Sequence, residues 1–85
     1  MRIENKHDRD HSAFIYNWED TSQSIALASK AIEASGHWDY TPPENGSGSY
    51  TVLVKRDKGG GSIMAAGAGG NNATCTFNGY SLVVS

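Results

Sequence analysis

The hydrophobic positions of this chain follow a helical period in one segment and a two-residue period in several others. Within Asp20–Gly36, one side of a projected helix collects the apolar and small side chains Ile25, Leu27, Ala28, Ala31, Ile32 and Ala34. Asp20 and Gln23 have the spacing of a capping box, and Gly36 is a typical residue for the end of a helix. The pattern therefore predicts a helix over Asp20–Gly36 whose small side chains let it pack closely on a sheet.

Three further segments alternate in the way that strands do. They are Ser12–Trp18, Tyr50–Arg56 and, more weakly because of its glycine and alanines, Ser62–Ala68. In the first segment the aromatic side chains share one face, opposite Ala13 and Ile15. In the second segment one face is formed by Tyr50, Val52 and Val54.

The last strand pair is predicted from Asn78-Gly79, a dipeptide preferred in two-residue type I′ turns. This turn would pair Phe77 with Tyr80, Cys75 with Leu82 and Ala73 with Val84. The expected fold is therefore α+β: a small antiparallel sheet of four to five strands, in the order β-α-β-β-β-β, with one helix packed on a face. The 85 residues suit a single domain, 1–85, in which the polar residues 1–11 form a flexible N-terminal segment.

Charge is distributed unevenly along the chain. Residues 1–44 carry eight acidic and four basic side chains, residues 45–85 carry one and three, and residues 59–85 carry none. An uncharged tail of this kind is expected to be paired, buried or used as an interface. The net charge of −2 and the lack of a basic stripe argue against direct nucleic-acid binding. A single cysteine, no apolar leader and no long apolar run favour a reducing intracellular compartment and no membrane association.

Aromatic and acidic residues around the predicted helix indicate a protein-binding surface. Trp38 and Tyr40 fall in a predicted loop, His37–Ser49, in which a proline pair forbids a helix. Exposed Trp and Tyr dominate many protein interfaces, so we expect these two to bind a partner, whereas Phe14 and Tyr16 are expected in the core. The acidic residues expected beside them are Glu19, Asp20, Glu33, Asp39 and Glu44.

One cluster has the composition of a metal site. His7, Asp8, Asp10 and His11 are close in sequence, and His37 is the third histidine of the chain. Because the segment has no apolar period to hold a helix, we interpret it as a solvated polar tail and assign no metal site. Cys75 has no neighbouring His or Lys and falls on the apolar face of the predicted hairpin, which favours an inert structural thiol. We assign no catalytic residue and no cofactor.

In layout, the chain resembles anti-CRISPR proteins, the small inhibitors that phages and mobile elements make against bacterial defence. The resemblance rests on a short intracellular chain, one alanine-rich helix ending near Gly36-His37-Trp38-Asp39-Tyr40, and hairpin strands after it. It implies a non-enzymatic protein in the cytoplasm of a bacterial host. Such a protein would dock directly on a Cas effector subunit and inhibit it, either sterically or by nucleic-acid mimicry.

Two other functions stay open on the residues alone. The first is a homo-oligomeric module, such as a homodimer, in which the uncharged tail forms a sheet between subunits. The second is a small metal-dependent enzyme that uses the cluster from His7 to His11, with His37 as a further ligand.

Overall fold

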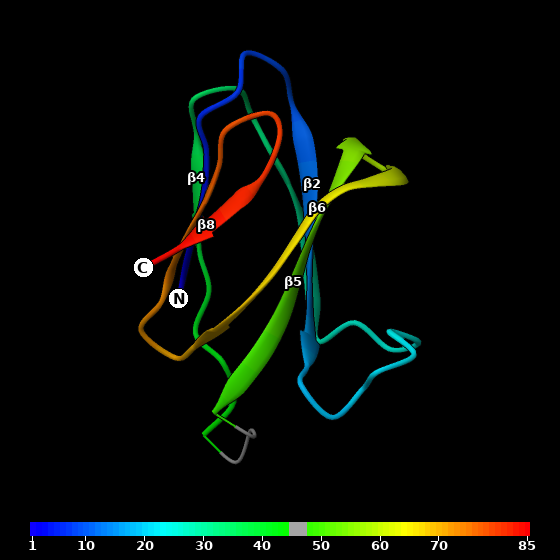
Figure 1. The fold of residues 1–85 in the computed structure, drawn as a ribbon, viewed down its shortest axis with the longest axis vertical. Coiled ribbons are helices and arrows are strands. Elements are labelled where there is room, and N and C mark those ends of the chain that lie inside the picture. Colours follow the sequence, from blue (N-terminus) through cyan, green and yellow to red (C-terminus); the bar gives the residue numbers. More distant parts are fainter. Residues whose placement is uncertain (45–47) are drawn as a thin grey trace.

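The computed structural model describes residues 1–44 and 48–85, and this part of the chain contains eight strands and no helix. The strands form two four-stranded sheets, ordered β4-β1-β7-β8 and β3-β2-β5-β6, which face each other as a sandwich (Figure 1). The fold is therefore all-β, and the expected α+β fold with one helix is wrong. The strand bounds are β1 Arg2–Asn5, β2 His11–Asn17, β3 Ala28–Ile32, β4 His37–Asp39, β5 Ser49–Asp57, β6 Gly60–Gly70, β7 Thr74–Phe77 and β8 Leu82–Val84.

The segment predicted as a helix forms a loop, an edge strand and a turn instead. The Asp20 carboxylate does accept backbone hydrogen bonds, but from Ser24 and Ile25, at 3.3 and 3.1 Å, within a loop. Gln23 has a left-handed φ of 51°, which a right-handed helix does not continue through. The chain then forms β3, whose register on β2 runs from Ala28 opposite Ile15 to Ile32 opposite His11.

The N-terminal segment is paired on both sides rather than loosely docked. β1 lies between β4 and β7, antiparallel to the first and parallel to the second. Ile3 on this strand is almost fully buried in the core. The Asn5 side chain is also buried, and its amide donates to the backbone carbonyls of Arg9 and Ile32 at 2.7 and 3.1 Å. The first residues of the chain therefore belong to the folded body.

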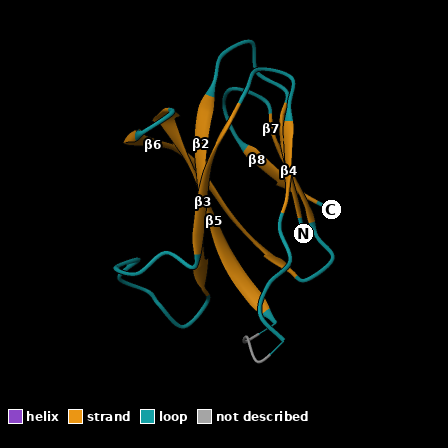
Figure 2. Cartoon of the chain, turned by 180° about the vertical axis from the view of Figure 1, so that it is seen from behind, coloured by secondary structure: helices purple, strands orange, loops and turns teal. Residues whose placement is uncertain are grey.

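The three alternating segments predicted as strands are confirmed as parts of β2, β5 and β6, which are consecutive neighbours in the second sheet. Ala13 on β2 is opposite Val54, and Ile15 is opposite Val52. These side chains face the first sheet and form the core with residues that it contributes. Figure 2 shows the two layers from behind, with β2, β3, β5 and β6 in one layer and β4, β7 and β8 in the other.

The predicted hairpin forms between β7 and β8, but in a different register. Phe77 pairs with Leu82 and Cys75 with Val84, two residues away from the expected partners. The Asn78 side chain explains the wider turn, because its Oδ1 accepts hydrogen bonds from the backbone N–H groups of Tyr80 and Ser81, both at 2.9 Å. The type I′ pairing of Phe77 with Tyr80 is wrong.

The predicted loop His37–Ser49 begins with β4, and its residues 45–47 lie outside the described part of the chain. Trp38 on β4 is buried in the core and Tyr40 packs against it, so their expected exposure is wrong. Phe14 and Tyr16 lie on the opposite face of β2 from the core residues Ala13 and Ile15.

Candidate protein-binding site

The outer edge of β6 is the longest open strand edge of the second sheet. β6 is the last strand in its sheet, and within residues 1–44 and 48–85 it pairs only with β5. From Ala65 to Gly70 the pairing with β5 is regular, whereas Met64 and Gly61 lie at register irregularities. No side chain on β6 is charged. We call the side of Ala65–Gly70 that points away from β5 the β6 edge.

The two faces of β6 differ in a way that the packing explains. Gly67 and Gly69 face the first sheet, and a Cβ at Gly69 would lie only 2.7 Å from the Cβ of Ala73. A Cβ at Gly67 would lie 3.1 Å from side-chain atoms of Leu82 and Val84. Glycine on the inner face therefore lets β6 lie close against the first sheet. The alternate residues Ala66 and Ala68 are exposed on the outer face.

A hollow of about 260 Å³ adjoins one end of the β6 edge. It is lined by Trp18, Ser49, Ala68, Gly69 and Gly70, and we call it the Trp18 hollow. Trp18 follows β2 directly, and its backbone N–H donates to the carbonyl of Ser49 at 3.1 Å. This hydrogen bond holds the start of the loop beside β5, while the Trp18 side chain remains 57% exposed. An exposed indole next to an open strand edge is a favourable surface for an apolar side chain of another protein.

Beyond the Trp18 hollow, the apolar side chains that β2 and β5 place on the outer face of the second sheet are largely covered. Tyr16 and Leu53 are nearly buried although neither belongs to the core between the sheets. Phe14 is half-buried beneath Lys55, whose ammonium lies 4.2 Å from the ring centroid. The loop after β2 and the turn between β5 and β6 both project on this side of the molecule (Figure 1).

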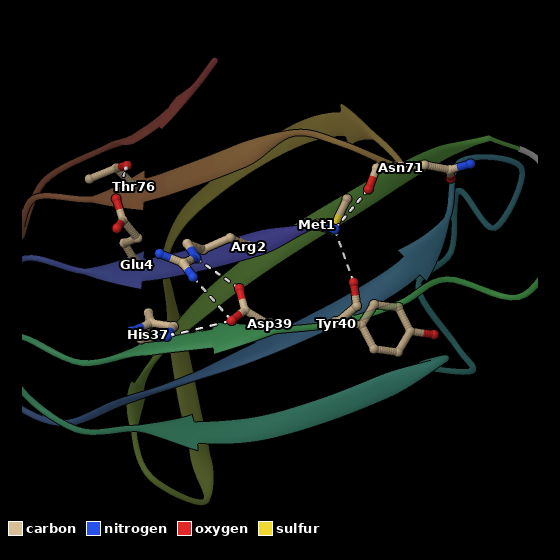
Figure 3. Close-up of polar contacts among 8 residues, drawn as sticks. All are labelled: Met1, Arg2, Glu4, His37, Asp39, Tyr40, Asn71 and Thr76. Carbon is tan, nitrogen blue, oxygen red and sulfur yellow. Dashed lines mark hydrogen bonds and ion pairs between the residues drawn. The ribbon is translucent and has the colours of Figure 1, made fainter.

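Of the residues expected to bind a partner, Asp39 is part of a polar network on the first sheet (Figure 3). Its carboxylate accepts two hydrogen bonds from Arg2, at 2.8 and 3.1 Å, and lies 3.5 Å from a ring nitrogen of His37. The hydrogen bond from Arg2 is the main cause that lowers the pKa of Asp39. Because both side chains are solvated, this ion pair orients the two side chains across β1 and β4 but contributes little to the free energy of unfolding.

The other acidic residues do not gather around Asp39. Glu33 follows β3 at the end of the sandwich where β2 begins, whereas Glu19 and Asp20 follow the opposite end of β2. The pKa of Asp20 is lowered, chiefly by the hydrogen bond from the backbone N–H of Ile25, so its carboxylate serves the loop itself. Glu44 is exposed before β5. This dispersion weakens the case for nucleic-acid mimicry by an acidic face.

The histidine cluster is brought together, but only in part. His7 and His11 stack with ring centroids 5.0 Å apart beside a hollow of about 460 Å³, which is also lined by Asp8, Arg9, Asp10, Arg56, Asp57 and Met64. Asp10 is used elsewhere: its carboxylate accepts from the backbone N–H of Ala34 at 2.9 Å and pairs with Lys58 at 3.2 Å. Its pKa is lowered, mainly by the Ala34 hydrogen bond.

The contacts of the two histidines fix one ring proton. His11 Nδ1 lies 3.2 Å from the carbonyl oxygen of Lys55, which can only accept, so this Nδ1 carries a proton. His11 Nε2 lies 2.8 Å from His7 Nδ1, and His7 Nε2 lies 3.3 Å from the Asp8 carboxylate. The two facing nitrogens are thus used in one hydrogen bond. Among the described residues, no three metal-ligating side chains converge.

Cys75 is fully buried between the sheets. Burial raises the pKa of its thiol and so keeps the sulfur protonated. Burial also keeps the sulfur out of reach of a substrate at the surface. This placement fits the structural role expected for it.

No protein-family model, curated protein or solved structure matches this chain significantly. The resemblance to anti-CRISPR proteins loses its main structural feature, because the alanine-rich helix does not form. In the described part of the chain, no helix is long and apolar enough to span a bilayer.

Sequence reasoning did not place the β6 edge or Trp18 in a binding site. The uncharged tail was the available signal, since residues 59–85 were expected to be paired, buried or used as an interface. What the pattern lacked was the position of β6 at the end of its sheet, which depends on pairings distant in sequence.

Proposed function

We propose that this chain is a non-enzymatic, cytoplasmic protein-binding module, and that it binds an extended segment of a protein partner along the β6 edge. The observation that carries this proposal is the regular, uncharged stretch Ala65–Gly70, open on one side and adjoined by the Trp18 hollow. Native edge strands are commonly protected by charges, prolines or covering loops. This stretch has neither charge nor proline, so a strand added from outside meets little resistance.

Strand addition combines two sources of affinity. Backbone hydrogen bonds along the β6 edge pair the donors and acceptors of the added strand with those of β6, although the Gly70 carbonyl already accepts from the N–H of Ala73 at 3.2 Å. The alanines and glycines of β6 are small and leave the backbone accessible, and the Trp18 hollow receives one side chain of the added segment. The first source is independent of the added sequence, whereas the second selects for an apolar side chain at one position.

The structure supports an enzymatic reading less well. Cys75 is buried, and the two clustered histidines are hydrogen-bonded to each other and to the Lys55 carbonyl. Binding is therefore the function that the described surface favours.

The experiment compares affinity capture from a bacterial lysate by the tagged protein and two lysine variants. Ala68→Lys places a charge at the β6 edge. Ala31→Lys is the matched control, because Ala31 is also an exposed alanine on an edge strand of the same sheet. A partner retained by the wild type and by Ala31→Lys, but lost with Ala68→Lys, supports the proposal.

Equal recovery with both variants would refute binding at the β6 edge. The sequence-based expectation of a Cas effector subunit as the partner remains a prediction, and mass spectrometry of the captured protein decides it.

A further inference from the structure

We propose that the strand pairing with the β6 edge is β6 of a second copy of this chain, in a two-fold symmetric dimer with one continuous eight-stranded sheet. This inference rests on the proposed function, because it names the partner of the same edge. It adds a defined register and a side chain for the Trp18 hollow.

Symmetry restricts how β6 pairs with itself. In an antiparallel pair, directly opposite residues point to the same side of the sheet. Because inner and outer residues alternate along β6, one residue must lie opposite its own copy, with the two-fold axis midway between the two. If Gly67 lies opposite Gly67 of the partner copy, Ala66 is opposite Ala68 and Ala65 is opposite Gly69 of the partner copy. Exposed alanines then meet on the outer face, and no charged side chain approaches its own copy.

The irregularity at Met64 extends this register to Ile63. Val54 is opposite Ala65 and the next residue, Lys55, is opposite Ile63, so Met64 is an extra residue in β6. Ile63 therefore shares the outer face with Ala66 and Ala68, although its number is odd. In the dimer it lies opposite Gly70 of the partner copy.

Gly70 lines the Trp18 hollow, so this register brings Ile63 of each copy to the hollow of the other. Ile63 is 55% exposed, and it is one of the largest apolar side chains exposed on β6. An unrelated strand would fill one hollow at most, and it would leave Ile63 in solvent. In the symmetric dimer, Ile63 and Trp18 of both copies are covered, which is why we favour a second copy over an unrelated strand.

Sedimentation equilibrium over a concentration series tests the dimer. The wild type and Ala31→Lys are expected to show the same monomer–dimer equilibrium. Ala68→Lys puts two lysines near each other across the axis, and Ile63→Ser empties both hollows, so each is expected to raise the dimer Kd about tenfold or more. Circular dichroism establishes that each variant is folded. If Ala68→Lys is not folded, Ile63→Ser tests the dimer alone, because Ile63 is largely exposed in the monomer and its replacement is not expected to disturb the fold.

A wild type that stays monomeric throughout the series would overturn the inference, as would an equal effect of Ala31→Lys and Ala68→Lys. In that case the lysate capture still decides the proposed function, because a different partner lost with Ala68→Lys upholds strand addition without self-association.

Disulfide trapping tests the register. Opposite residues in an antiparallel pair have Cα atoms about 5 Å apart, within the range of a disulfide, whereas diagonal neighbours are about 7–8 Å apart. A mixture of Ala66→Cys and Ala68→Cys is therefore expected to form a cross-linked heterodimer faster than either variant cross-links with itself. Ala31→Cys is the control for random collision. Equal rates for the mixture and for the separate variants would exclude the register in which Gly67 lies opposite Gly67 of the partner copy.

Discussion

The close approach of β6 to the first sheet makes Gly69 a sharp test of the fold. In Gly69→Ala the added Cβ would lie 2.7 Å from the Cβ of Ala73 and 3.3 Å from a methyl carbon of Val84. Carbon atoms pack best about 3.5–4.0 Å apart, so the first contact is about 1 Å too short. The Cβ of Ala73 is fixed to the backbone and cannot rotate away. Overpacking of this kind costs about 1–3 kcal/mol, which lowers the Tm of a domain of this size by roughly 5–20 °C.

Urea unfolding followed by circular dichroism measures this loss, and Gly70→Ala is the matched control. A Cβ at Gly70 would meet only the carbonyl oxygen of Gly48, at 3.4 Å, and neither glycine has a positive φ. Gly70→Ala is therefore expected to be neutral, or to gain about 0.4–1 kcal/mol because it restricts the unfolded chain. If the two variants are equally stable, β6 does not pack on the turn before β7, and the arrangement of the sheets is wrong at this point.

Three other predictions concern the core and the response to acid. The buried hydroxyl of Tyr50 makes no hydrogen bond to the described residues, so Tyr50→Phe should leave the free energy of unfolding unchanged or raise it; a loss above about 1 kcal/mol in urea unfolding would contradict this. Ile3→Ala should cost about 2–5 kcal/mol because Ile3 is buried on a central strand, whereas Ile25→Ala should change stability by less than about 0.5 kcal/mol, because Ile25 is 77% exposed. The pKa of Asp10 is lowered from the ordinary value of 3.8, so its ionised form stabilises the fold at neutral pH, and this contribution disappears as the pH falls through the lowered value. Asp10→Asn should therefore lose less stability than the wild type between about pH 5 and pH 2, as followed by thermal unfolding.

Sequence patterns predicted the strands that are richest in aromatic and β-branched residues. β2 and β5 alternate clearly because one face of each packs in the core, as with Ile15 and Val52. In the β7–β8 hairpin the faces were predicted correctly and the partners were not. A shift of two residues leaves every side chain on its original face, so the hydrophobic pattern does not distinguish Leu82 from Tyr80 as the partner of Phe77. The turn decides, and Asn78 bonds to the backbone across a wider loop.

The helix and the N-terminal strand show where local reasoning ends. Residues 20–36 contain alanine, serine and lysine, whose intrinsic preferences are too weak to resist an available strand partner. Ile32 is buried when β3 pairs with β2, and the N–H of Leu27 donates to the Ile15 carbonyl at 2.7 Å at the start of that pairing. β1 is too short to show a period, and its partners β4 and β7 lie far along the chain. Neither pairing is visible in a local window.

Of the features visible in the sequence, the lack of charged residues after residue 58 says most about the candidate site. In the structure, this lack of charge has different explanations on the two faces of β6. On the inner face of β6, the close packing against β7 and β8 explains why glycine, and no charged residue, stands at Gly67 and Gly69. Burial does not explain the outer face, where Ile63, Ala66 and Ala68 are exposed and a lysine or glutamate would fit without strain. Within the described chain, nothing in the packing of the monomer requires this edge to be uncharged. Pairing with another strand favours an uncharged edge, and in a dimer each unfavourable charge would count twice.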